Sequence, residues 1–102
     1  SSIRLHDSLD GRTDSLKHNE RVRLRKVLHA LKREKAWVIE LQPQLGQEAL
    51  TEALIKRVRK TQEQITAFLV VRGISPARIF PVWPEEGSGQ GESTGILIQA
   101  VK

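Results

Sequence analysis

Apolar and polar residues alternate with helical spacing in two long parts of the chain. Residues 16–34 place Leu24, Val27, Leu28 and Leu31 on one helical face, with Arg and Lys on the other sides. Residues 47–73 repeat this spacing in a longer helix, whose apolar stripe is interrupted at Thr61 and Gln62. The members of that stripe are Leu50, Leu54, Val58, Ile65, Phe68 and Leu69. The pattern predicts two amphipathic helices.

Four short runs of bulky or β-branched residues predict strands. They cover residues 3–5, 36–42, 78–83 and 95–101. Pro43 and Gly46 are expected to close the second strand. Pro81 inside the third indicates an edge position or a very short strand, because proline cannot donate to a sheet. Residues 84–94 are polar and glycine-rich, which predicts a loop to which the sequence assigns no role.

The predicted order is β-α-β-α-β-β. Consecutive βαβ units place both helices on one face of a mixed sheet, which gives a two-layer α/β (α+β) sandwich. The last strand is expected to lie antiparallel to the strand before it, through a hairpin-like connection. A chain of 102 residues fits a single domain over residues 1–102. Because it begins Ser-Ser, we expect a piece excised from a longer protein.

The net charge of +5 favours anionic partners such as nucleic acid, anionic lipid or cell-wall polymer. Two basic runs, RVRLRK and KRVRK, fall on the two predicted helices. The alternative is a solvated surface on which acidic residues balance these charges at helical spacing. Those acidic residues are Glu20, Glu34, Glu52 and Glu63.

Residue types needed for common catalytic and metal chemistry are scarce. The absence of cysteine excludes disulfides, thiol catalysis and thiolate zinc sites. His18 and His29 are about three helical turns apart, too far to share a metal. The run GSGQG lacks the Lys-Ser/Thr of a phosphate-binding loop. We therefore expect no enzyme, no cofactor and no metal. No apolar run approaches the roughly 18 residues that cross a bilayer.

The junction between the second helix and the third strand contains Phe68-Leu69, Gly73-Ile74, Pro76 and Arg78-Ile79. With these residues the junction resembles the OmpA-like (OmpA/MotB C-terminal) domain family. That family typically has a helix ending in Tyr-Leu, a few residues, Gly-Ile, a short proline-containing turn, Arg/Lys-Ile and a glycine-containing strand end. The order of elements agrees over nearly the whole chain, and the residues agree from about Ile65 to Ile79. Glycine suits the left-handed conformation after the helix, where Ile74 can contact the helix end.

The resemblance implies a peptidoglycan site from which this chain departs. Family members that bind peptidoglycan hold the charged ends of diaminopimelate with an Asp after the second strand and an Arg in the second helix. Leu45, or Gly46 with a shift of one residue, stands at the Asp position, and Thr61 stands at the Arg position. Polar residues in the region of the family site are Gln44, Glu48, Arg57 and Lys60. These four are the candidate ligand-binding residues, and Trp83 is the candidate for a protein contact.

The resulting functional expectation is a non-catalytic scaffold or interaction domain of a bacterial envelope assembly, such as a secretion system, pilus or motor. The resemblance places it in the periplasm, with any membrane anchor outside this fragment and other envelope proteins as partners. One alternative is peptidoglycan anchoring through a rearranged site. A second is a basic nucleic-acid-binding module, against which the small number of aromatic residues argues. The sequence leaves the parent protein and the oligomeric state open.

Overall fold

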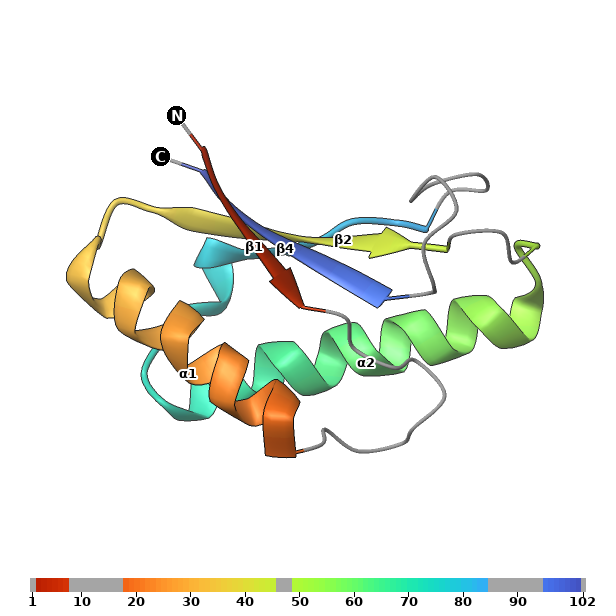
Figure 1. The fold of residues 1–102 in the computed structure, drawn as a ribbon, viewed down its shortest axis with the longest axis horizontal. Coiled ribbons are helices and arrows are strands. Elements are labelled where there is room, and N and C mark those ends of the chain that lie inside the picture. Colours follow the sequence, from red (N-terminus) through yellow and green to blue (C-terminus); the bar gives the residue numbers. More distant parts are fainter. Residues whose placement is uncertain (1, 8–17, 46–48, 85–94, 102) are drawn as a thin grey trace.

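The computed structural model describes residues 2–7, 18–45, 49–84 and 95–101, and confirms the predicted order of elements (Figure 1). Residues 16 and 17 of the predicted first helix, and the loop at 85–94, lie outside this part. The elements in chain order are β1 (Ser2–Asp7), α1 (His18–Arg33), β2 (Val38–Gln44), α2 (Glu52–Val71), the short 3-10 helix η1 (Pro76–Arg78), β3 (Ile79–Pro81) and β4 (Gly95–Val101).

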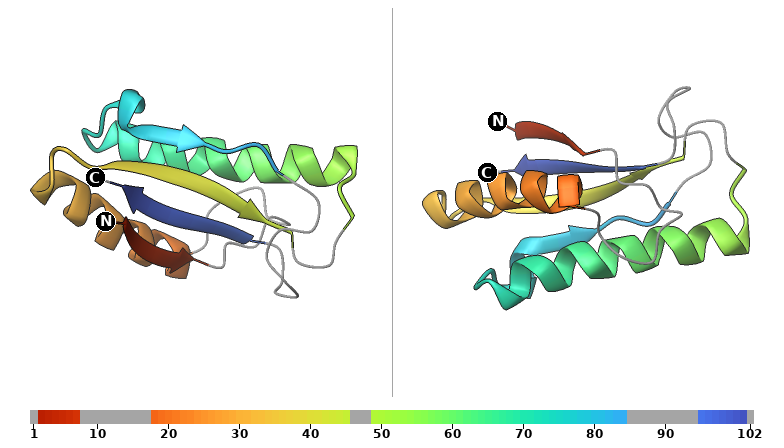
Figure 2. Two further views of the ribbon diagram at one scale, coloured as in Figure 1. Left: turned by 90° about the horizontal axis from the view of Figure 1, so that it is seen from above. Right: turned by 60° about the horizontal axis from the view of Figure 1, so that its bottom comes forward.

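The four strands form one mixed sheet in the order β1-β4-β2-β3, with both helices on one face (Figures 1 and 2). β4 runs antiparallel to β1 and β2, and β2 runs parallel to β3. This arrangement confirms the two-layer sandwich. The expected pairing of the last two strands is wrong, because β4 lies between β1 and β2. Its apolar run explains this position: Ile96 and Leu97 point to opposite faces and both are buried, as in a central strand.

The core lies between the sheet and the two helices. Alternate residues of β2 face the helices and are fully buried, among them Ile39 and Leu41. The predicted stripe of α1 packs against them from Leu24 to Leu31. The stripe of α2 is also confirmed from Leu54 to Leu69. The helix begins at Glu52 after the N-cap Thr51, later than predicted, so Leu50 precedes it and is partly buried against the core.

β2 continues through Pro43, which was expected to close it. The carbonyl of Leu41 faces β3, where it accepts a bond of 3.0 Å from the N–H of Val82. The N–H and C=O groups of successive residues point to opposite sides of a strand, so the backbone of Pro43 faces the side of β3, as that of Leu41 does. At Pro43 there is no longer a partner on that side, because β3 pairs with β2 only as far as Pro81. The missing N–H of Pro43 therefore costs no bond with β4, and the strand extends to Gln44.

A glycine-based cap ends α2, as the sequence predicts. Gly73 has a φ of 102°, in the left-handed region that favours glycine. Its N–H donates to the carbonyl of Val70 at 3.0 Å, and the N–H of Ile74 donates to that of Leu69 at 3.1 Å. These two bonds define a Schellman motif. Ile74 is buried against the end of the helix, so the cap also belongs to the core.

The turn after this cap joins β3 to the end of α1 through Arg78. Its Nε donates to the carbonyl of Trp37 at 2.9 Å, and its Nη2 donates to those of Leu31 (2.9 Å) and Glu34 (2.8 Å). The last carbonyls of a helix lack partners within the helix and carry its negative dipole end. A guanidinium with several donors in a fixed plane satisfies three carbonyls together. The Arg-Ile of the turn therefore fixes where α1 ends against the sheet.

β3 is short and lies at the edge of the sheet, which confirms both expectations drawn from Pro81. Ile79 points into the core, and Phe80 is exposed on the other face. The N–H of Ile79 is bonded to the carbonyl of Pro76 within the turn. One turn thus ends α2, caps α1 and starts β3.

Candidate interaction surface

Leu45 and Thr61, two positions at which the resemblance expects ligand-holding charges, lie in the core, and Gly46, the alternative to Leu45, lies outside the described residues. Leu45 is 0% exposed and belongs to the main apolar cluster. Thr61 is 3% exposed, and its Oγ1 donates to the carbonyl of Arg57 at 2.9 Å. Neither side chain reaches solvent, and the Thr61 hydroxyl already has a partner. This chain therefore presents no charged group for a ligand at either position.

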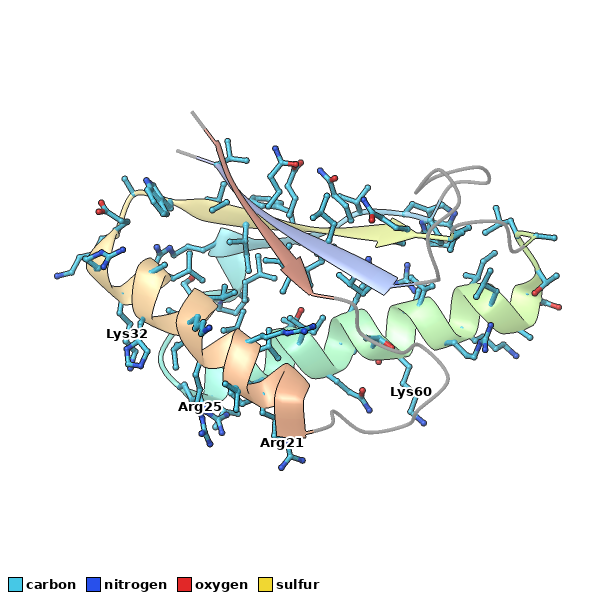
Figure 3. The ribbon with its side chains drawn as sticks, viewed as in Figure 1. Arg21, Arg25, Lys32 and Lys60 are labelled. Atoms are coloured by element: carbon cyan, nitrogen blue, oxygen red, sulfur yellow. The ribbon has the colours of Figure 1, made fainter. Side chains whose placement is uncertain are left out.

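Gln44 and Lys60, two of the four polar candidates, do not lie on one surface. Gln44 alternates along β2 with the buried Pro43 and Leu45, so it points to the sheet face opposite the helices. Lys60 extends from α2 away from the sheet (Figure 3). Arg57 is half-buried on α2, and Glu48 lies outside the described residues. Gln44 and Lys60 thus lie on opposite sides of the molecule.

Gln62 has a structural role that the interrupted stripe did not reveal. It is 3% exposed, and its Nε2 donates to the carbonyls of Leu41 (3.1 Å) and Val82 (2.8 Å). A buried amide is stable only where such partners exist. Gln62 therefore connects the middle of α2 to the middle of β2 and to the residue that follows β3. The signal in the sequence was a polar pair inside an apolar stripe, but its partners are about 20 residues away in the chain.

An open groove of about 400 Å³ lies beside Gln62, along the flank of α2 that faces the turn and β3. The residues that line it are Arg59, Gln62, Glu63, Thr66, Ala67, Val70, Pro76 and Pro81. Its walls combine small apolar side chains with one cation and one carboxylate. The arrangement suits an apolar side chain of a partner with polar groups around it.

Trp83 extends this groove at the end near Arg59. The Arg59 guanidinium lies over the Trp83 ring, 5.0 Å from its centroid, which is within cation–π distance. Trp83 is nevertheless 58% exposed, so most of the ring remains available for contact. Tryptophan and arginine are the residue types most enriched where protein interfaces concentrate their binding energy. The groove and Trp83 together are called the α2–β3 groove below.

The described residues contain neither a membrane-spanning helix nor a metal-binding cluster. No helix among residues 18–45 and 49–84 is long and apolar enough to span a membrane. Within the described ranges, no group of three or more His, Asp or Glu side chains is placed to hold a metal ion.

Comparison with solved structures supports the fold, whereas comparison of sequences finds no match. The chain is similar to the solved OmpA-like domain of FopA1 from Francisella tularensis subsp. tularensis SCHU S4, with a TM-score of 0.75 and 9% sequence identity. The match covers 98% of this chain and 71% of the other. No protein-family model matches the sequence, and no curated protein matches it. The chain thus has the OmpA-like fold, as the turn predicted.

Proposed function

We propose that this chain is a non-catalytic interaction domain of the bacterial cell envelope, in which the peptidoglycan site of OmpA-like domains is degenerate. It acts as a periplasmic scaffold in a larger envelope assembly, such as a secretion system, pilus or motor. The OmpA-like fold supports an envelope location, because the resemblance links this fold to that compartment. Fold alone does not determine the ligand, so the site decides the rest.

The observation that carries the proposal is the burial of Leu45 and Thr61. A zwitterionic stem-peptide residue needs an acceptor for its ammonium group and a donor fork for its carboxylate. Leu45 has neither, and it is enclosed by the core. Binding in the family's mode would require both positions to be charged and open to solvent.

The surface proposed for the protein partner is the α2–β3 groove. It combines an exposed tryptophan, an arginine already held over the ring, and an apolar hollow beside them. A partner side chain that enters this hollow loses water on several sides at once, which is typical of interface hot spots.

The first test is co-sedimentation of the purified domain with peptidoglycan sacculi at about 50 and 300 mM salt, which span weak and strong screening. A chain with a net charge of +5 will adsorb to an anionic polymer at low salt. We expect this binding to disappear at high salt and to resist competition by free stem peptide. Binding that survives high salt and is displaced by stem peptide would overturn the degenerate-site proposal and support the rearranged-site alternative.

The second test places a photo-crosslinking residue at Ala67, which is exposed inside the groove, in the full-length protein in its host. The matched control carries the same residue at Lys35, an exposed position in the turn after α1. We expect a discrete adduct with an envelope protein from Ala67, reduced by Trp83→Ala, and none from Lys35. The absence of an adduct at Ala67, or identical adducts at both positions, would contradict a partner in the groove.

A further inference from the structure

The outer face of α1 carries an unusual concentration of positive charge. Over residues 21–33, every exposed position is Arg or Lys except Val22 and His29, and none is acidic. These exposed positions are Arg21, Val22, Arg23, Arg25, Lys26, His29, Lys32 and Arg33. In Figure 3, Arg21, Arg25 and Lys32 extend from the helix on the side away from the sheet, and Lys60 of α2 points the same way. The exposed cations of residues 21–33 are called the α1 basic face below.

Arg21, Arg25 and Lys32 recur four and seven residues apart, so they form one stripe along the helix. Among the side chains that the structure describes, no carboxylate lies in ion-pair distance of these three. Arg33 and Glu34 approach to 3.9 Å, but both are solvent-exposed, and such pairs contribute little. Among the described side chains, the balanced surface considered from the sequence is therefore not formed around this stripe.

We propose that the α1 basic face docks on the anionic surface of a phospholipid bilayer. Basic residues near such a surface are attracted to its lipid phosphates at close range. The apolar residues of α1 pack in the core, so none of its large apolar stripe is available to enter the bilayer. The contact is consequently electrostatic, with the domain lying on the membrane rather than inserted into it.

The shape of this layer favours a bilayer over nucleic acid. α1 and α2 lie in one layer against the sheet, so the basic face is part of a broad surface (Figure 2). A duplex is read by a helix that projects into a major groove only about 12 Å wide. Single strands are held by aromatic side chains that stack on bases. Trp37 and Phe68 are buried, and the two exposed aromatic residues, Phe80 on β3 and Trp83 beside the groove, lie away from these cations.

The α1 basic face and the α2–β3 groove comprise different residues, so this lipid contact is independent of the protein partner proposed above. The test is co-sedimentation with vesicles of phosphatidylcholine alone or with about 30 mol % phosphatidylglycerol, an anionic fraction that attracts basic segments. We expect binding only to the anionic vesicles, falling steeply between about 50 and 300 mM salt. The variant Arg21→Gln/Arg25→Gln/Lys32→Gln should bind roughly a hundredfold more weakly, since each cation contributes several-fold.

The matched control is Lys35→Gln/Lys56→Gln/Arg72→Gln, which removes the same charge from exposed positions outside both the α1 basic face and the α2–β3 groove. It should retain nearly all vesicle binding, and circular dichroism should show both variants folded. Equal losses in both variants would overturn the proposal, because net charge rather than this face would then govern binding. Failure to bind anionic vesicles would also overturn it, as would tighter binding of duplex DNA at equal phosphate concentration and salt.

Discussion

Two regions of this domain follow the OmpA-like pattern to very different degrees. The turn from Leu69 to Ile79 carries the Gly-Ile, the proline and the Arg-Ile of the pattern, and the structure gives most of these residues a contact. The end of β2 and the middle of α2 correspond to it in position only. There the resemblance expects charges, and Leu45 and Thr61, which stand at those positions, are both buried.

The difference shows which residues the fold itself requires. Gly73 provides a left-handed cap, and Arg78 donates to the carbonyl of Leu31 in the last turn of α1 and to those of Glu34 and Trp37 after it. A charge that faces a ligand has no such role, and an apolar residue at the same position can add to the core. A chain can therefore keep this fold without charges at the two positions.

The largest expected effect on stability comes from placing an acid at Leu45, where the resemblance expects one. Leu45→Asp introduces a carboxylate into the centre of the apolar cluster and removes a buried leucine. We expect the free energy of unfolding to fall by at least about 4 kcal/mol, a large part of a domain's stability. Urea denaturation followed by circular dichroism measures it.

Gln44, the residue before Leu45, provides the matched control for Leu45→Asp. Gln44→Asp adds the same carboxylate one residue earlier, on the other face of β2, and should change stability by no more than about 0.5 kcal/mol. If Leu45→Asp were tolerated as well as Gln44→Asp, Leu45 would be accessible in solution. The two regions would then not differ in the way described.

The second-largest expected effect on stability comes from replacing Arg78 in the turn. Arg78→Ala leaves the carbonyls of Leu31, Glu34 and Trp37 without their charged donor, and we expect a loss of about 3 kcal/mol in the free energy of unfolding. Arg78→Lys keeps the charge but not the planar fork, so it should recover only part of that loss. Full recovery by lysine would contradict a role for the planar fork, because a single charge would then be sufficient.

The smallest expected effect on stability comes from replacing Gly73 in the cap that ends α2. A Cβ added at Gly73 would meet no atom within 4 Å, so the cost of Gly73→Ala is conformational alone. We expect a loss of about 1 kcal/mol, from the left-handed φ that alanine adopts poorly. Gly73→Asn should cost less, because asparagine tolerates this region. Thermal unfolding of the two variants side by side measures the difference, and a neutral alanine variant would contradict the strained geometry.

The sequence predicted the elements well because their signals are local. Helical spacing in α1 and α2, the glycine cap and the apolar run of β4 each depend on residues that are near one another in the chain. The neighbour of β4 was mispredicted because adjacency in sequence suggested a hairpin. The burial of both faces at Ile96 and Leu97, which marks a central strand, was the better guide.

The remaining features depend on pairs that are distant in sequence. Arg78 reaches carbonyls more than 40 residues away, and Gln62 reaches others about 20 residues away. No spacing rule predicts which carbonyl a side chain will meet. The position of the α2–β3 groove likewise depends on how α2 lies against the turn, although Trp83 was marked in advance by its place at the end of a strand.

The short edge strand also determines how a partner can approach. On the outer side of β3, Pro81 has no N–H, and the N–H of Ile79 is already bonded to Pro76. An extended segment from another protein that came to lie along β3 would find carbonyl acceptors but no donors to complete a ladder. This edge is thereby protected from strand addition and from the aggregation that exposed edges invite. Recognition on this side of the domain therefore has to use side chains.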